Sequence, residues 1–326
     1  MIFDDLREKY PHFTRVAHHL EETSALLMGK PLQQLREAEP NYDFAEKLCR
    51  DAYALCGGDE ERVFDRAREF VELSMEFLYL QRKLERSGQY LYRTFLEVEE
   101  QVYNDPERKR AGAPYMWALY FSQVFWITHG RVWQFFLDEF ATQARGVGGV
   151  LEVPSGNGLF LAHFLLQNPN WSGLAVDLSD TAIEFATEVL SLNGVRARAE
   201  VKKEDFFRLE SADGFDRIVC GEFLEHVEDP FSVLRRLNEL LAADGRLFLT
   251  VAVWAANIDH IYLYESAEQV RDHIRASGFE IEREVVQNVF GNKRPDEART
   301  PINYSAILRC SKHMGHGFGH GRRKVP

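Results

Sequence analysis

The chain has 326 residues, enough to bury a large core in one large domain or two ordinary ones. Its 51 acidic residues outnumber its 39 Lys and Arg residues, and the formal charge of -12 works against binding to nucleic acid phosphates. The most apolar stretch, Tyr115–Ile127, is shorter than the roughly 20 residues that span a bilayer, and acids occupy the start where an export signal is basic. Four cysteines without Cys-x-x-Cys spacing suit a reducing compartment. We therefore expect a cytoplasmic protein that binds neither nucleic acid nor membranes.

The first 145 residues or so have the pattern of an all-helical region. Apolar residues recur every three or four positions over Arg62–Ser87, which predicts an amphipathic helix that stops at Gly88. A second helix is expected over Tyr90–Tyr103, and an aromatic one over Tyr115–Phe140. The rings of the aromatic helix form either core or the wall of a pocket. We expect residues 1–145 to cap a ligand-binding site in the rest of the chain and to bind one of its ligands, the acceptor named below, to form a homodimer interface, or both.

The pattern changes at the glycine-rich segment 145–149, after which β-branched runs alternate with helical patterns. This alternation predicts an α/β fold with a doubly wound, mostly parallel sheet. The expected strands are Gly149–Val153, Gly173–Val176, Ala197–Val201, Arg217–Cys220 and Arg246–Val253, and the expected helices are Gly158–Gln167, Asp180–Asn193, Pro230–Ala242 and Ser266–Ser277. The runs Phe279–Val289 and Ile302–Cys310 have no helix between them. They predict an antiparallel hairpin that completes a seven-stranded sheet.

The last segment, residues 312–326, is rich in histidine, glycine and basic residues. Its histidines, His313, His316 and His320, could ligate a metal, but no acid or cysteine accompanies them. We therefore expect a disordered tail, and no metal site in the protein.

The segment Val150–Gly158 places a turn of small residues between the first predicted strand of the sheet and the helix after it, so backbone can approach a ligand there. Asp177 ends the next strand, where its carboxylate would accept hydrogen bonds from the hydroxyls of a ribose, unless it is an acid at a helix N-terminus. Leu161 stands where a dinucleotide motif has its third glycine, which disfavours NAD. After the third strand, Asp205 could accept from an adenine amino group while Phe206 contacts the ring.

In this order, the Glu152–Gly158 turn, Asp177, Asp205 and the Leu-Glu-His-Val run at residues 224–227 resemble the class I S-adenosylmethionine-dependent methyltransferases of small-molecule type. The resemblance covers roughly Gly146–Cys310 and implies that residues 146–311 form a domain that binds S-adenosyl-L-methionine. The residues that it assigns to the cofactor are Glu152, Pro154, Ser155, Gly156, Gly158, Asp177, Leu178, Asp205, Phe206 and Glu222. Glu152 would orient the turn, and Glu222 would lie at the mouth of the site.

One residue departs from the pattern of this family, which usually has glycine where this chain has Pro154. Proline holds φ near about -65° and lacks an N–H, so a turn that needed positive φ there would have to rearrange. We expect negative φ at Pro154 and an intact turn, because Gly156 and Gly158 remain.

The loop after the fifth strand carries the polar residues Asn257, Asp259 and His260 at the edge of the sheet that should face the acceptor. A hydroxyl acceptor must lose a proton, and His260, with a reference pKa of about 6.5, is our candidate for the base or for a group that orients the acceptor. His226 is either catalytic or satisfies a turn. The other residues expected in the acceptor pocket are Tyr262, Phe125 and His129.

The residues after the fourth strand, Gly221–Leu224, lack the Asn/Asp-Pro-Pro-Tyr/Phe sequence with which base-modifying relatives grip a planar amino group. Together with the acidic charge, this favours a small molecule, such as a natural product, or a short peptide as acceptor. Oxygen is the favoured atom, with nitrogen and carbon as alternatives. Two other classes remain open, an NAD-dependent oxidoreductase and a non-catalytic protein that binds S-adenosylmethionine.

Overall fold

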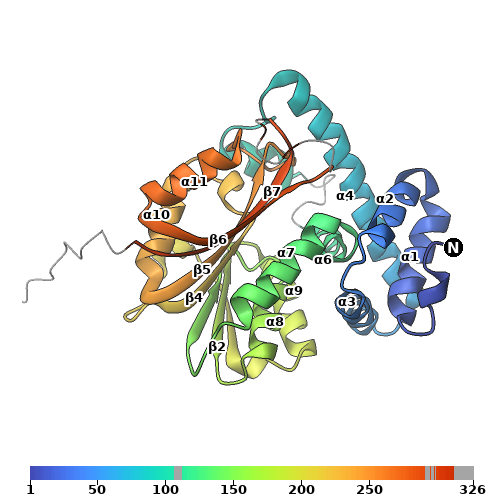
Figure 1. Cartoon of the computed structure of the whole chain (residues 1–326), viewed down its shortest axis with the longest axis horizontal. Coiled ribbons are helices and arrows are strands. Elements are labelled where there is room, and N and C mark those ends of the chain that lie inside the picture. Colours follow the sequence, from blue (N-terminus) through green and yellow to red (C-terminus); the bar gives the residue numbers. More distant parts are fainter. Residues whose placement is uncertain (106–111, 291–293, 295–296, 298, 312–326) are drawn as a thin grey trace, which may run out of the picture.

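The computed structural model describes every residue except 106–111, 291–293, 295–296, 298 and 312–326. It places a group of helices beside a seven-stranded sheet that carries helices on both faces (Figure 1). The basic run 108–110 and the expected disordered tail lie outside the described residues. Within the described part, no helix combines the length and the apolar character that crossing a membrane requires.

The sheet has the order β3-β2-β1-β4-β5-β7-β6. Its five parallel strands are β1 (Gly149–Glu152), β2 (Ser172–Asp177), β3 (Ala199–Lys203), β4 (Phe215–Gly221) and β5 (Leu241–Val253), and the antiparallel pair is β6 (Phe279–Asn288) and β7 (Ile302–Cys310). This confirms the predicted fold, although β2, β3, β4 and β5 start one to five residues away from the predicted positions. The order reverses between β1 and β4, and ligands of such sheets bind beyond the carboxyl ends of the strands at this point.

Among the described residues, the four helices that follow β1 in the chain cover parts of both faces of the sheet. They are α8 (Leu159–Gln167), α9 (Asp180–Leu192), α10 (Pro230–Leu240) and α11 (Ala267–Ala276). Figure 1 shows α8 and α9 on one face and α10 and α11 on the other. Ser179 caps α9 by accepting a hydrogen bond from the N–H of Ala182 at 3.3 Å, and Asp229 caps α10 in the same way.

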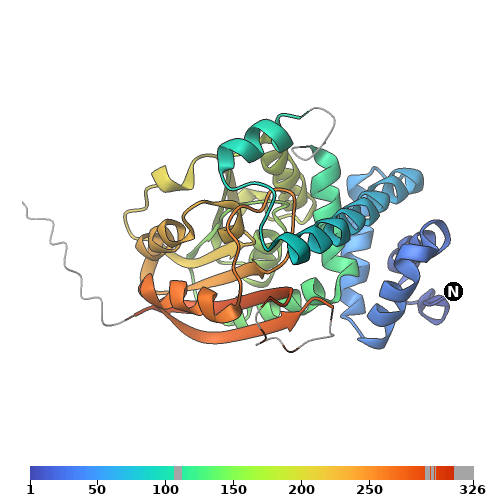
Figure 2. The same cartoon turned by 90° about the horizontal axis from the view of Figure 1, so that it is seen from above.

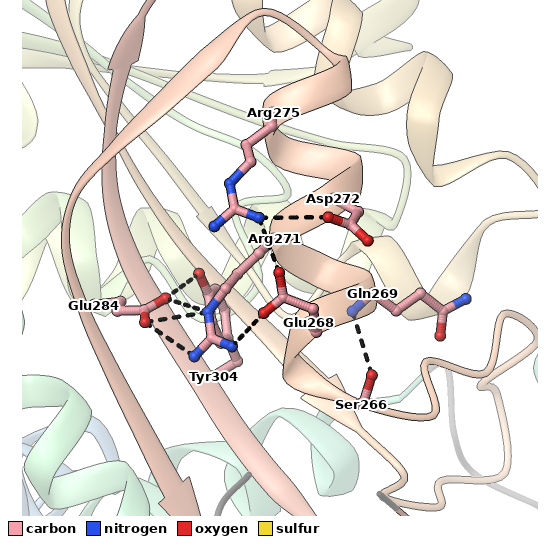
Figure 3. A network of polar contacts seen from close by, with 8 residues as sticks. All are labelled: Ser266, Glu268, Gln269, Arg271, Asp272, Arg275, Glu284 and Tyr304. Atoms are coloured by element: carbon pink, nitrogen blue, oxygen red, sulfur yellow. Dashed lines mark hydrogen bonds and ion pairs between the residues drawn. The ribbon is translucent and has the colours of Figure 1, made fainter.

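Helix α11 is attached to the antiparallel strands by one arginine (Figure 3). The guanidinium of Arg271 donates to both carboxylate oxygens of Glu284 on β6, at 2.9 to 3.1 Å. The hydroxyl of Tyr304 on β7 donates to the same carboxylate at 2.8 Å. One carboxylate thus joins the helix and both strands.

The N-terminal region consists of α1 (Pro11–Thr23), α2 (Ala25–Glu37), α3 (Tyr42–Leu55), α4 (Glu60–Ser87), α5 (Phe95–Val98), α6 (Ala113–Phe125) and α7 (Ile127–Phe135). The amphipathic helix predicted over Arg62–Ser87 is confirmed as α4, which begins at the cap Asp59 and ends at Gly88, whose φ is 71°. Seen from above, α4 extends from the N-terminal helices toward the centre of the molecule (Figure 2).

Two predicted helices of this region were too long. Residues 90–94 are not helical, because Thr94 forms a capping box with Glu97 and starts α5 there; residues 99–103 then form a π-helical turn. The aromatic helix is interrupted at Trp126, whose extended backbone (φ -94°, ψ 119°) separates α6 from α7, and a second π-helical turn covers Phe136–Ala141. This break lets the indole of Trp126 pack against Phe70 and Phe77 of α4.

Candidate active site

One continuous cavity of about 1220 Å³ lies beyond the carboxyl ends of β1, β2 and β4. The N-terminal helices contribute apolar side chains to its wall, among them Met28, Phe77 and Phe125. Gly156 and Asp177 line its other end. Pockets for small ligands reach about 1,000 Å³, so this volume is sufficient for a cofactor and an acceptor together.

The glycine turn after β1 is closed by backbone hydrogen bonds. The N–H of Ser155 donates to the carbonyl of Val176 on β2 at 2.8 Å, and the N–H of Gly158 donates to the carbonyl of Ser155 at the same distance. Positive φ falls on the glycines, 47° at Gly156 and 70° at Gly158, and Pro154, which follows a cis peptide bond, is not among the positive-φ residues. The turn therefore accommodates proline as expected.

The carboxylate of Glu152, at the end of β1, is buried and accepts a hydrogen bond from the N–H of Leu161 at 3.1 Å. Burial raises its pKa to about 8. Glu152 thereby ties the strand to the first turn of α8, the helix that follows the glycine turn.

Asp177 ends β2 and holds the glycine turn from the side. Its Oδ2 accepts from the N–H of Gly156 at 3.0 Å, and its Oδ1 accepts from the N–H of Ser179 at 2.9 Å. Because Ser179 is the residue that caps α9, Asp177 is not the cap of that helix. Leu178, which is 58% exposed, lines the cavity next to it.

Asp205 and Phe206 line the same end of the cavity. Asp205 begins a short 3-10 turn by accepting from the N–H of Phe207 at 3.0 Å, and Phe206 is buried against the ring of Phe223. The preceding residue, Glu204, donates its N–H to the carbonyl of Asp177 at 3.0 Å. This bond keeps the two acidic strand ends next to each other.

A polar cluster lies at the end of β4, where Glu222 and His226 line the cavity. Glu222 has φ of 46° and donates its N–H to the carbonyl and hydroxyl oxygens of Thr250. Glu225 is fully buried and accepts from the N–H of Ala252 at 3.3 Å through Oε1. Burial raises the pKa of both carboxyls, most strongly that of Glu225.

Two histidines stand next to these carboxyls, with ring centroids 4.8 Å apart. The Nδ1–H of His226 donates to the carbonyl of Asp259 at 3.2 Å, and the Nδ1–H of His260 donates to the carbonyl of Ala255 at 2.9 Å. A carbonyl oxygen only accepts, so each ring carries its proton on Nδ1 and its lone pair on Nε2. Both rings line the cavity.

Comparison with known proteins agrees with this geometry. Residues 151–247 match the family model described as a methyltransferase domain. Those residues belong to the class I S-adenosylmethionine-dependent methyltransferases. The chain is 32% identical over 115 residues to a ubiquinone biosynthesis O-methyltransferase of Haemophilus ducreyi, a match over 33% of this chain and 48% of the relative. It is also 32% identical over 101 residues to the protein of that name in Xanthomonas axonopodis pv. citri, over 31% of this chain and 41% of the relative.

The matches to curated relatives of the methyltransferase domain are partial, since the chain spans about half their length or less. Two solved structures share the fold over a longer part of the chain. The alignment with a mitomycin 7-O-methyltransferase covers 76% of this chain and 72% of that protein, with a TM-score of 0.52 and 18% identity. The alignment with a riboflavin-derivative dimethyltransferase of Streptomyces davawensis covers 73% of this chain and 70% of that protein, with a TM-score of 0.51 and 18% identity.

The N-terminal region holds the loop after β5 of the methyltransferase domain in place. Gln81 of α4 donates to the carbonyl of Trp254 and accepts from the N–H of Ala256, both at 3.0 Å. The hydroxyl of Tyr90 donates to the carbonyl of Ala255 at 2.9 Å, and that of Tyr103 to Oδ2 of Asp259 at 3.1 Å. Our sequence reasoning did not single out these three residues, because only the tertiary fold brings them to the loop.

Most predicted acceptor residues reach the cavity. Asn257, Asp259, Phe125 and His129 line it, and burial lowers the pKa of His129 to about 4, so its ring is neutral at pH 7. The structure does not bring Tyr262 there.

The N–H groups of Ile261 and Tyr262 both donate to the carbonyl of Glu225, and the ring of Tyr262 instead packs against Tyr264 and His273 beside α11. Glu225, to which the sequence reasoning assigned no role, also belongs to the polar cluster at the end of β4. The Glu-x-x-Glu-His spacing of residues 222–226 was the available signal.

Proposed function

We propose that the protein transfers the methyl group of S-adenosyl-L-methionine to an oxygen of a small-molecule acceptor. One observation carries the proposal. The glycine turn, Asp177, His226 and His260 all line one continuous cavity. The curated relatives, whose printed name is O-methyltransferase, favour oxygen over nitrogen or carbon.

The proposed cofactor residues lie where each part of an S-adenosyl group would need them. The turn at Ser155–Gly158 brings backbone against the methionine part, and Asp177 would accept from the ribose hydroxyls. Asp205 and Phe206 would bind the adenine. The sulfonium supplies an activated methyl group, so the chain needs to hold the acceptor in line behind it and exclude water, and such positioning contributes roughly 7 to 11 kcal/mol.

The part of the cavity wall that the N-terminal helices form is suited to an apolar or aromatic molecule. It is formed by side chains of the N-terminal helices, including Phe77, Phe125 and Trp126. The polar side chains of this end are concentrated around Asp259 and His260. We propose that an acceptor hydroxyl is directed to these polar groups, with His260 as its base or as the group that orients it.

Calorimetric titration with S-adenosylhomocysteine tests the proposal, with NAD as the control ligand. We expect micromolar binding of S-adenosylhomocysteine, no binding of NAD, and a large loss of affinity in Asp177→Ala. Methyl transfer from labelled S-adenosyl-L-methionine to a panel of phenols, alcohols and amines would then identify the acceptor class. Binding of NAD in place of S-adenosylhomocysteine would overturn the proposal in favour of an oxidoreductase.

A further inference from the structure

We propose that Glu225, His226 and His260, with Glu222 beside them, bind a divalent cation that receives the acceptor's oxygen. This inference rests on the proposed methyl transfer for its chemical role, but the binding site itself does not depend on it. It also revises the expectation, drawn from the cysteines and the tail, that the protein has no metal site.

The first argument is geometric. One ligating atom from each of Glu225, His226 and His260 lies within 4.8 Å of the others. Carboxylate oxygens and imidazole nitrogens bind divalent cations at about 2.0 to 2.2 Å, which separates two ligands by roughly 3 to 4.4 Å. A rearrangement on the order of 1 Å by this estimate brings all three onto one ion.

The second argument is the orientation of the imidazoles. Both histidines donate Nδ1–H to a backbone carbonyl, that of Asp259 for His226 and that of Ala255 for His260. This bond sets the tautomer with the lone pair on Nε2, and histidines that ligate metals use the same outer bond. A single hydrogen bond from Nδ1–H to a backbone carbonyl is also common for an ordinary buried histidine. Two neighbouring imidazoles that both make this bond beside a carboxylate point to a ligand that they share.

The third argument is the state of the two carboxyls. Glu222 and Glu225 are buried against each other, and each still has one carboxyl oxygen, Oε1 of Glu222 and Oε2 of Glu225, without a donor from the described residues. No lysine or arginine is among the groups that act on either carboxyl. Two adjacent carboxylates in the interior repel each other, whereas a divalent cation between two carboxylates and two neutral imidazoles gives a balanced charge.

A mixed set of imidazole and carboxylate ligands suits Mn²⁺ or Zn²⁺, and Mg²⁺ less well. An acceptor hydroxyl bound at an open position of the ion has a lowered pKa and releases its proton to water. Its oxygen then forms a bond to the methyl carbon as the carbon–sulfur bond breaks, and the electron pair of that bond stays on sulfur as the thioether. In this scheme His260 acts as a ligand and the cation takes over the orienting role.

Binding of Mn²⁺ to chelator-treated protein, followed by electron paramagnetic resonance, tests the site without an acceptor. The protein used is the full chain with three substitutions, His313→Ala, His316→Ala and His320→Ala, so that ions bound by these histidines are not counted. His226→Asn, His260→Asn and Glu225→Gln are compared in this background. His163→Leu, which removes a buried histidine from α8 outside the cluster, is the matched control.

We expect one Mn²⁺ in the parent and the control, and at least about 10-fold weaker binding in each cluster variant. Unchanged binding of S-adenosylhomocysteine would show that a variant is folded. The inference is overturned if the parent binds no Mn²⁺, or if the folded cluster variants bind it as the control does. Tight Mn²⁺ binding without any binding of S-adenosylhomocysteine would keep the site and remove the proposed methyl transfer.

Discussion

The hydroxyl of Tyr103 donates a hydrogen bond to Oδ2 of Asp259 at 3.1 Å, and this bond joins the N-terminal region to the polar end of the cavity. Tyr103 itself lines the cavity. Positions at this end should therefore act on the acceptor and not on the cofactor.

Replacing Tyr103 by phenylalanine removes one donor from Asp259 and keeps the ring. A hydrogen bond to a carboxylate contributes about 1 kcal/mol or more, so we expect the KM for the acceptor to rise roughly 5-fold or more. The affinity for S-adenosylhomocysteine should not change. Steady-state kinetics and calorimetry separate the two effects, with Tyr79→Phe, an exposed tyrosine of α4, as the control. Equal losses for acceptor and cofactor would contradict this assignment.

Replacing Gly158 by alanine should disturb the glycine turn. The backbone there has φ of 70°, and a Cβ would lie 2.8 Å from the Cβ of Ala186 on α9. We expect a loss of about 1 to 3 kcal/mol in the free energy of unfolding and weaker binding of S-adenosylhomocysteine. Gly130→Ala is the matched control, because no atom lies within 4 Å of its added Cβ and its φ is not positive. A Gly158→Ala protein with full affinity would show that the turn can shift.

The stability of the protein should fall in mild acid through His163. This histidine of α8 is buried against the rings of Phe44 and Trp133, and burial lowers its pKa to about 3. An unfolded histidine titrates near about 6.5, so between these values only the unfolded chain binds the proton. Stability from this group is complete above pH 6.5 and is lost by up to about 1.4 kcal/mol per pH unit as pH falls toward 3.

Urea unfolding of the protein and of His163→Leu between pH 7.5 and 4.5 measures this loss. The variant should gain stability relative to the parent as pH falls, since it has no proton to exclude. Other groups titrate alike in both proteins and cancel in the difference. Parallel curves would mean that His163 is solvated or paired when protonated.

Arg271→Met should weaken the attachment of α11 to the antiparallel strands (Figure 3). It removes hydrogen bonds to both oxygens of Glu284, for which we expect a loss of about 1 to 2 kcal/mol in the free energy of unfolding. Arg275→Met is the control, because Arg275 pairs with the exposed acids Glu268 and Asp272, and its loss should matter less. Equal effects in urea unfolding would show that the shared carboxylate adds nothing.

The sheet was predictable because each of its strands lies in a short β-branched run. The hairpin of β6 and β7 followed from the missing helix between them, and the family pattern placed the glycine turn and Asp177 at the strand ends. The local sequence pattern did not predict helix breaks that tertiary packing imposes on helix-compatible residues. The break at Trp126 occurs inside a continuous run of helix-compatible aromatic residues, and nothing in the spacing marks it.

The part of the loop after β5 that lines the cavity was predicted in part. Asn257, Asp259 and His260 line it as their position after β5 suggested, whereas Tyr262, which was assigned by its place in the same loop, does not. Its direction depends on the carbonyl of Glu225, which lies far away in the sequence and holds the backbone of the loop. Gln81 contacts residues that lie even farther from it in the sequence, and no local spacing pattern predicts such contacts.

The amide of Gln81 bonds to the loop after β5 much as the edge of a neighbouring strand would, with one donor and one acceptor. The loop that we propose faces the acceptor thus takes its shape from a helix outside the domain that contains it. We therefore expect changes in α4 to alter acceptor recognition while the glycine turn and Asp177 stay as they are. The same dependence means that removing the N-terminal region would leave a carbonyl and an N–H of the loop without their partner, so the folding of the two regions is coupled.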